Sequence, residues 1–339
     1  MDVTAIVPAH NEGANIEATI KALKQQVRKV IVACDHCTDD TYQKAIQAGA
    51  VAFETVDNQH RKAGALNQAL ENYVDWQLPD QYIFICDADT VIADDWIERA
   101  QIAIDAGGYD AVGSVFFGDA DRSSMIEFCL QLEWYRYTNQ IKRRKKVFVL
   151  TGTASMVSAE MFQKVKARKG SFYDEDSITE DFALTIDLKE AGARIISPIS
   201  CYCTTEIMPN WRLLFLQRRR WYLGALQQMV RRKRDRVLFP YVFQQLMLLI
   251  SVLAFMGLIV FTGYLMVQDL IIFSFFWFLI GVIFAVERVI TIWNQDRQAK
   301  IFALMIFPEL IYSLFLQIAY LGALVQLLSG SAGTWNHLD

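Results

Sequence analysis

The chain has little of what would indicate a secreted, zinc-binding or nucleic-acid-binding protein. Its 339 residues include six cysteines and four histidines, and the formal net charge is −4. Cys34 and Cys37 have C-x-x-C spacing, but no second pair and no histidine cluster completes a zinc site. We therefore expect reduced cytosolic thiols and no nucleic-acid partner.

A signal peptide, internal repeats and low-complexity segments are also missing from the sequence. Met1 leads within a few residues into Ala5-Ile6-Val7-Pro8, which has the apolar pattern of a first core strand. We therefore expect the first domain to begin in the cytosol.

The first half of the chain alternates strand and helix patterns. Strand candidates are residues 3–7, 29–34, 50–55, 82–86, 111–117 and 147–155, and helix candidates are residues 14–25, 41–47, 64–73 and 95–106. This alternation predicts an α/β fold with βαβ units around a largely parallel sheet. Ligands of such sheets bind at the carboxyl ends of the strands. The residues of interest at these ends are Pro8, Asn11, Glu12, Asp35, Asp87 and Asp89.

The second half of the chain contains long apolar runs. Residues 237–268 include no Asp, Glu, Lys or Arg and are long enough to cross about 30 Å of hydrocarbon. A second run covers 270–286, and a third covers 301–328 with a break at Pro308-Glu309. Three transmembrane spans are the simplest count, and a re-entrant or interfacial third piece is the alternative.

Basic residues predict the orientation in the membrane. Residues 212–236 hold nine basic side chains and one acidic one directly before the first apolar run, a pattern typical of the cytoplasmic membrane border. Such a segment also attracts anionic lipid headgroups. The loop 294–300 carries Arg297 and Lys300, whereas the tail 329–339 has neither Lys nor Arg. We therefore predict a multi-pass protein of the cell inner or plasma membrane, with its first domain in the cytoplasm.

Asp87 and Asp89 stand one residue apart, directly after the strand candidate 82–86. Two carboxylates at this spacing can reach one divalent cation, and Mg²⁺ and Mn²⁺ favour such oxygen ligands. The cation would neutralise the diphosphate of a leaving nucleotide. For this pair taken alone, a solvated acidic turn is the alternative. Asp35 ends a neighbouring strand and is a further ligand candidate.

Two more motifs precede helices. Lys62, in His60-Arg61-Lys62-Ala63-Gly64, would suit a phosphate together with free N–H groups at a helix start, and an ordinary basic turn is the alternative. Thr179-Glu180-Asp181 opens a helical pattern, where Thr179 would be a cap and the acids would suit the helix dipole. Alternatively, Asp181 is a general base that removes a proton from an acceptor hydroxyl. One base and a metal-bound leaving group suit a single displacement that inverts an anomeric carbon.

The segment around Gln217-Arg218-Arg219-Arg220-Trp221 is predicted to be an amphipathic helix. At about 100° per residue, one stripe holds Trp211, Phe215, Tyr222 and Leu226, and the opposite face holds Gln217, Arg220, Trp221 and Gly224. We expect the stripe to face the bilayer, with Arg218 and Arg219 extending toward lipid phosphate. Arg220 would then stabilise diphosphate charge and Trp221 would stack under an acceptor sugar. A plain basic juxtamembrane helix is the alternative.

The ordered motifs together resemble those of the family 2 inverting glycosyltransferases. The resemblance covers about residues 3–236 and is to the branch that holds cellulose, hyaluronan and poly-N-acetylglucosamine synthases, with ceramide glucosyltransferases as relatives. It rests on Asp35, Asp87-x-Asp89, Thr179-Glu180-Asp181 and Gln217-x-x-Arg220-Trp221. It implies a Rossmann-like GT-A domain at 1–206, an interface helix at 207–236, a transmembrane module at 237–329 and a tail at 330–339.

The resemblance also implies roles for individual residues. The nucleotide-sugar donor, with UDP as its nucleotide, would be bound by Pro8, Asn11, Glu12, Asp35, Lys62, Asp87 and Asp89. Asp89, assisted by Asp87, would hold Mg²⁺ or Mn²⁺, and Asp181 with Glu180 beside it would be catalytic. The acceptor and the diphosphate would be contacted by Thr151, Gly152, Gln217, Arg220 and Trp221.

The product class remains open in the sequence. Synthases of this branch that extrude a polymer usually have transmembrane spans before the catalytic domain and more spans after it. We favour extension of a polysaccharide, with further copies or a partner subunit completing a channel. The alternatives are transfer of one sugar to a lipid acceptor and, less favoured, a catalytically silent sugar-nucleotide-binding membrane subunit.

Overall fold

The computed structural model describes residues 1–339 except 119–121, 123, 145–146, 233–234, 269–274 and 331–339. The chain divides into two compact units, Met1–Asn210 and Trp211–Asp339. The first unit contains the predicted α/β domain, and the second contains the apolar helices.

A seven-stranded sheet forms the centre of the first unit. Its order is β3 (Val51–Glu54), β2 (Lys29–Cys34), β1 (Asp2–Ala9), β4 (Gln81–Cys86), β8 (Ala154–Ser158), β6 (Ala111–Gly113) and β9 (Ile195–Ile196). The pairs β2–β3, β1–β2 and β1–β4 are parallel, as predicted, whereas β8 runs antiparallel to both β4 and β6. This antiparallel strand brings the residues before Ala154 to the same sheet edge as the carboxyl end of β4.

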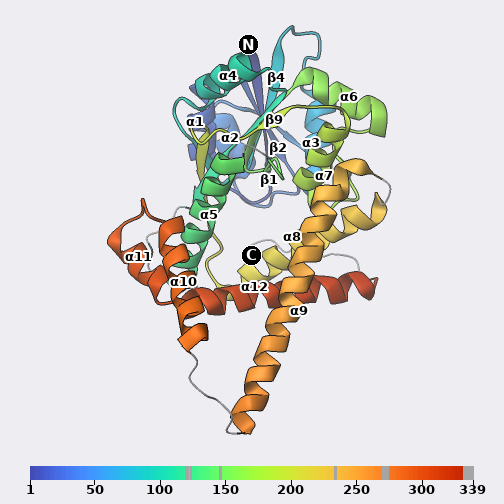
Figure 1. Ribbon diagram of the computed structural model, residues 1–339. Helices are drawn as coiled ribbons and strands as arrows, with labels where there is room; N and C mark the ends of the chain where they lie inside the picture. The colour runs from blue at the N-terminus through green and yellow to red at the C-terminus, as the bar shows by residue number, and fades with distance from the viewer. Residues whose placement is uncertain (119–121, 123, 145–146, 233–234, 269–274, 331–339) are drawn as a thin grey trace. The chain divides into compact units, whose positions relative to one another are not determined.

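Helices cover both faces of this sheet. Alternate residues of β1 point to opposite faces, so that Val7 packs with the residues of α1 (Ile16–Lys24) and α4 (Trp96–Gly107), whereas Ile6 packs with α3 (Arg61–Asn72). Figure 1 shows α1, α2 (Thr41–Gln47) and α4 on one side of the sheet, and α3, α6 (Ala159–Lys169) and α7 (Glu180–Glu190) on the other. The domain is therefore a three-layer α/β/α structure.

Two strand predictions require correction. The run 111–117 forms two strands in different sheets, because the chain bends at Ser114 between β6 and β7 (Val115–Gly118). The Trp96 indole N–H donates to the Ser114 hydroxyl over 2.8 Å and holds this bend. β7 joins β10 (Tyr202–Thr205) and β5 (Thr90–Ile92) in a small second sheet. In the run 147–155 the strand begins only at Ala154. The residues before it form no strand and lie in the site described below.

The second unit is helical. It consists of α8 (Trp211–Arg231), the 3-10 turn η1 (Arg236–Leu238), α9 (Phe239–Val267), α10 (Phe275–Thr291), α11 (Arg297–Leu304) and α12 (Phe307–Leu328). The third apolar run is divided between α11 and α12 near Pro308, which is tolerated at the helix start because its missing N–H is not needed there. Arg288 of α10 forms an ion pair with the buried Glu309 of α12.

The aromatic stripe of α8 packs against α12. The ring of Trp211 lies 4.9 Å from that of Phe315, and the ring of Tyr222 lies 5.4 Å from that of Tyr320. The expectation that this stripe faces lipid is therefore wrong for these residues, because aromatic side chains of α12 offer a protein surface for the same apolar contacts.

Arg218 also differs from the expectation. It is 6% exposed, and its guanidinium lies 4.5 Å from the centre of the Trp221 ring, so its side chain is buried instead of extending toward lipid phosphate. The Arg219 guanidinium lies 5.6 Å from the centre of the Phe215 ring. Both arginines therefore pair with aromatic rings of their own helix.

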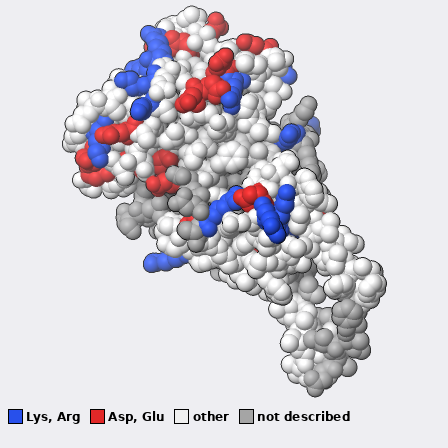
Figure 2. Space-filling view, turned by 90° about the vertical axis from the view of Figure 1, so that its left-hand side faces the viewer, with Lys and Arg blue, Asp and Glu red and all other residues white. Residues whose placement is uncertain are grey.

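Two of the described helical segments, Arg236–Val267 and α12, are long and apolar enough to cross a membrane. Only 6% of the apolar stretch of the first segment is buried. The lower end of α9 lies at the bottom of Figure 1. At the bottom of Figure 2 the described residues are all white, which means that no Lys, Arg, Asp or Glu is visible among them. The predicted middle span begins at 270, and residues 270–274 lie outside the described part. The described part of this span is the 17-residue helix α10. The described helices therefore support two of the three predicted spans.

Candidate active site

The carboxyl ends of β1, β2 and β4 lie at one edge of the large sheet, because Ala9 pairs with Cys34 and Ile6 pairs with Ile85 in parallel register. Asp35 and Asp87 directly follow two of these strands. Asn11 and Glu12 follow β1, and Pro8 is the buried penultimate residue of that strand. The exposed Asn11 has a φ of 55°, and its amide oxygen accepts hydrogen bonds from the N–H and hydroxyl of Thr38.

Asp35 is the centre of a hydrogen-bond cluster. Its Oδ1 accepts hydrogen bonds from the Thr55 hydroxyl at 2.7 Å and the Asn58 amide at 2.8 Å, and it lies 2.9 Å from Nδ1 of His36. The Asn58 side chain also accepts a hydrogen bond from the backbone N–H of His60. Asp35 is 8% exposed, so these contacts hold the carboxylate in one orientation.

Asp87 and Asp89 lie in a turn that neighbouring segments hold in place. The N–H of Asp87 donates to the carbonyl of Thr153 over 3.0 Å, and the Thr19 hydroxyl donates to the carbonyl of Ala88 over 2.7 Å. Oδ1 of Asp89 accepts from the hydroxyls of Thr90 and Thr205, at 3.1 and 3.3 Å. The backbone of this turn and the carboxylate of Asp89 are therefore held at the edge by hydrogen bonds.

Lys62 joins the acidic turn to the start of α7. Its Nζ lies 2.5 Å from Asp87 Oδ1 and 3.0 Å from Glu180 Oε1. Burial alone would lower the pKa of Lys62, but Asp87, Glu180 and Asp181 together raise this pKa well above its ordinary value. Lys62 is therefore a permanent cation between carboxylates that come from distant parts of the chain.

The start of α7 packs against the segment that contains Gly152. The Gly152 N–H donates to Asp181 Oδ2 over 3.4 Å, and the Leu150 N–H donates to the hydroxyl of Thr185, which in turn donates to the Asp181 carbonyl. A Cβ on Gly152 would lie 2.9 Å from Lys62 Nζ and 3.5 Å from Glu180 Oε1. Glycine at this position therefore allows the lysine and the acids to approach the backbone.

Thr179 precedes α7 but does not cap it through its side chain. Its hydroxyl and that of Thr151 are buried and have no hydrogen-bond partner among the described residues. The alternative that treats the motif as an ordinary capped helix start is therefore not supported. The two hydroxyls leave hydrogen-bonding capacity beside Gly152 and Glu180.

Three carboxyl groups of this edge have raised pKa values. Burial, followed by repulsion from Glu180, raises the pKa of Asp181 to about 6 despite Lys62. Burial, followed by repulsion from Asp87, raises the pKa of Asp89 to about 6, and burial, followed by repulsion from Asp89, raises that of Glu12 to about 7. Clustered carboxylates of this kind are typical of sites that bind a cation or transfer a proton.

Sequence reasoning missed several members of the cluster. Asn15 donates to both Glu12 and Glu206, so the loop after β1 is joined to the end of β10. Thr55 and Asn58 follow β3 and hold Asp35. Thr55 and Asn58 could have been identified from the sequence, because polar residues that follow parallel strands gather at one edge of the sheet. Glu206 could not, because the pairing of β10 with the small sheet is not readable from the sequence.

The remaining sequence-predicted residues lie in the second unit. Gln217, Arg220 and Trp221 are on α8, and Trp221 is 37% exposed with one contact to the Arg218 guanidinium. All six cysteines are free thiols.

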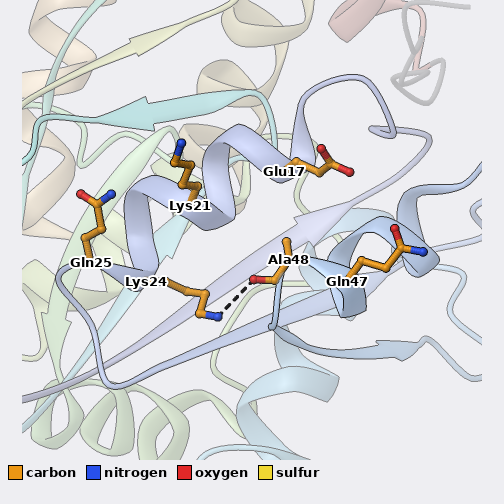
Figure 3. A pocket seen from close by; sticks show the side chains of 6 residues that line it. All are labelled: Glu17, Lys21, Lys24, Gln25, Gln47 and Ala48. Carbon is orange, nitrogen blue, oxygen red and sulfur yellow. Dashed lines mark hydrogen bonds between the residues drawn. The ribbon is translucent and has the colours of Figure 1, made fainter.

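A surface hollow is formed by other residues of the first unit. It is lined by Glu17, Lys21, Lys24, Gln25, Gln47 and Ala48 (Figure 3), and the Lys24 ammonium donates to the Ala48 carbonyl. The last turns of α1 and α2 form much of this hollow. Because these helices return from the carboxyl ends of the strands, their last turns lie at the opposite edge of the sheet. The hollow therefore does not belong to the acidic cluster.

Among the described residues, no three or more His, Cys, Asp and Glu side chains are arranged as a preformed metal site. Asp87 and Asp89 supply two carboxylates, which is the number that Mg²⁺ commonly takes when substrate phosphates and water complete its shell.

The first unit has the GT-A fold, which is typical of glycosyltransferases. A mannosyltransferase from Pyrobaculum calidifontis, PcManGT in complex with GDP-Man and Mn²⁺, has a similar fold. The TM-score is 0.63 at 18% identity, and the match covers 97% of this chain and 87% of that one. Residues 4–166 match the sequence model of glycosyl transferase family 2, so the chain contains a domain of this family.

Relatives with curated names are poly-beta-1,6-N-acetyl-D-glucosamine synthases. The protein of Staphylococcus aureus (strain COL) is 24% identical over 237 residues, and that of Staphylococcus epidermidis is 23% identical over the same length. In both comparisons the match covers 68% of this chain and 56% of the relative. The chain therefore matches little more than half the length of these synthases.

Proposed function

We propose that this enzyme transfers a sugar from a nucleotide sugar to a hydroxyl group of a growing polysaccharide. The relatives named as poly-beta-1,6-N-acetyl-D-glucosamine synthases support a polysaccharide product. The motif resemblance to that branch supports UDP as the nucleotide. Asp35, held by Thr55 and Asn58, is the proposed contact for the nucleoside.

The observation that carries this proposal is the position of Asp181. Its carboxylate lies at the N-terminus of α7, beside the Gly152 N–H and the group formed by Lys62, Glu180 and Asp87. A pKa of about 6 leaves most of this carboxylate ionised at neutral pH and still basic enough to accept a proton. Asp181 would take the proton of the acceptor hydroxyl, whose oxygen attacks the anomeric carbon while the nucleoside diphosphate leaves. One such displacement inverts the anomeric configuration.

A divalent cation fits the residues at the end of β4. The raised pKa values of Asp89 and Glu12, caused by burial and neighbouring carboxylates, indicate that negative charge here lacks compensation. Asp89 and Asp87 would hold Mg²⁺ or Mn²⁺, which when bound would neutralise charge on the leaving diphosphate. Lys62 already offsets the charge of Asp87 and would contact the same diphosphate. The PcManGT complex with Mn²⁺ is consistent with this assignment.

The second unit is proposed to anchor the enzyme in the cell inner or plasma membrane through its two long apolar helices, with the first unit on the cytoplasmic side. Gln217, Arg220 and Trp221 of α8 are proposed to contact the acceptor and the diphosphate. Further copies or a partner subunit would complete a polymer channel.

A second candidate function is the transfer of one sugar to a lipid acceptor. It is favoured by the described part of the helical unit, in which only two segments are long and apolar enough to span. Two spans suit binding of a lipid acceptor in the bilayer better than they suit a channel.

Product size separates the two functions. Membranes that hold the protein are incubated with labelled nucleotide sugars and Mg²⁺ or Mn²⁺, with Asp181→Asn as the blank. We expect a long water-soluble product that is absent from the blank. A single labelled species that extracts into organic solvent would support the glycolipid function instead. No difference from the blank with any donor would contradict both.

A further inference from the structure

A buried side-chain amide joins the helix of Lys62 to the segment that leads into α7. Asn67 lies on α3, is 5% exposed, and faces residues 171–179, which connect α6 to α7. Its Nδ2 donates to the Tyr173 carbonyl over 3.1 Å and to Glu175 Oε1 over 2.9 Å. Its Oδ1 accepts the Tyr173 N–H over 2.9 Å. Each polar atom of this amide is therefore occupied by the connecting segment.

The same segment has a second attachment to the loop before α3. Nε2 of His60 lies 3.6 Å from Glu175 Oε2, and Nδ1 lies 3.3 Å from the Glu175 carbonyl. The backbone N–H of His60 donates to Asn58, whose amide donates to Asp35. A continuous series of contacts thus leads from Asp35, through His60 and Glu175, to Asn67.

Aromatic packing holds the start of this segment. Phe172 stacks on Trp76 with ring centres 4.9 Å apart, and Phe172 and Tyr173 are 2% and 3% exposed. The start is therefore fixed by burial whether or not Asn67 forms its hydrogen bonds. Beyond Tyr173 the chain is half-buried or exposed as far as Ser177 and Ile178, and the contacts of Asn67 and His60 with Glu175 attach it there to α3 and to the loop before α3.

Resting on the function proposed above, we propose that Asn67 is a positioning residue for catalysis. It does not contact the donor or acceptor. It fixes the segment 171–179 against α3 and thereby holds Glu180 and Asp181 at the correct distance from Lys62 and Asp87. Since Lys62 lies in the first turn of the helix that carries Asn67, one helix sets both sides of the Lys62–Glu180 contact.

The test is Asn67→Asp, which keeps the shape of the side chain and the acceptor for the Tyr173 N–H. It removes both donated hydrogen bonds and places a carboxylate beside Glu175. We expect kcat to fall about 10- to 100-fold, because small displacements of reacting groups have effects of this size. The donor Kd, measured by calorimetry with UDP-sugar, should change less than about 3-fold, since the Asp35 cluster is retained.

Asn72→Asp is the matched control, because it makes the same chemical change at an exposed position of the same helix. It should leave kcat within about 2-fold of the wild-type value. The double variant Asn67→Asp with Glu175→Gln restores a donor opposite the new carboxylate and should recover at least about 5-fold in kcat over Asn67→Asp.

Three results would overturn the inference. The first is an unchanged kcat in Asn67→Asp. The second is a parallel loss of kcat and donor affinity in that variant, which would indicate general loss of structure. The third is no recovery of kcat in the double variant. The glycosyltransferase function proposed above is tested by a different variant. If Asp181→Asn transfers sugar at the wild-type rate, the assignment of the base is wrong, whatever Asn67 does.

Discussion

Replacing Asp181 with Asn should abolish transfer and at the same time stabilise the fold. The amide cannot accept the acceptor proton, and loss of a general base lowers rates by about 10²- to 10⁴-fold. Its carbonyl can still accept the Phe182 N–H that Asp181 Oδ1 accepts at 2.7 Å, so the start of α7 is retained. Donor binding should be unchanged, because Asp35, Lys62 and Asp89 are unaltered.

The size of the stabilisation follows from the raised pKa of Asp181. The folded value is about 6 and the ordinary value is 3.8, so ionising this group in the folded protein is unfavourable. A difference of about two in pKa corresponds to about 3 kcal/mol, and this is an upper limit for a side chain that solvent partly reaches. The Asp181→Asn variant would also lose the weak contact with the Gly152 N–H. We therefore expect a gain of about 1–2 kcal/mol at pH 8, or about 2–8 °C in Tm.

The sign of the pH dependence provides an internal control. A carboxyl group with a raised folded pKa binds protons more tightly in the folded state, so its penalty is absent below pH 3.8 and complete above about pH 6. The stability gain of Asp181→Asn at pH 5 should therefore be about half that at pH 8. The transfer rate of the wild-type enzyme should fall in the same range, to about one tenth of its plateau at pH 5.

The assays are initial transfer rates and thermal unfolding in detergent, each measured from pH 5 to pH 8 on both proteins, with donor binding by calorimetry. Transfer by Asp181→Asn within a few-fold of wild type would refute the role of the base. A variant that is less stable at every pH would refute the stability argument, because it would mean that the carboxylate contributes favourable contacts.

Three further outcomes are expected. Asp89→Ala should weaken nucleotide-diphosphate binding by about 10-fold or more in Mg²⁺ or Mn²⁺ and little in EDTA, and equal losses in both would contradict the metal assignment. Gly152→Ala should displace Lys62 Nζ, which would lie 2.9 Å from the new Cβ, and lower kcat by about 10-fold with Tm nearly unchanged. Asn58→Leu should release Asp35 and raise the donor Kd by about 5- to 20-fold in a calorimetric titration, whereas an unchanged Kd would remove Asp35 from the nucleoside contact.

The local pattern of the first half predicts most of the catalytic fold. The four parallel strands and α1–α4 lie within a few residues of the expected ranges, because their apolar periodicity reflects burial on one or both faces. The helix α5 (Met125–Arg144) was not among the expected elements, and the antiparallel β8 was not distinguishable from a parallel strand. Strand direction depends on long-range pairing, which a single-sequence pattern does not contain.

The sequence by itself determined that Asp35, Asp87 and Asp89 belong to one edge, since carboxyl ends of neighbouring parallel strands meet there. Only the tertiary structure decided that Lys62 joins Asp87 to Glu180, and that the stripe of α8 packs on α12. The physical reason is the separation along the chain of the residues that interact. Hydrophobic periodicity specifies which face of an element is buried, whereas the partner that covers this face, and the side chains brought together as a result, depend on contacts between residues far apart in the chain.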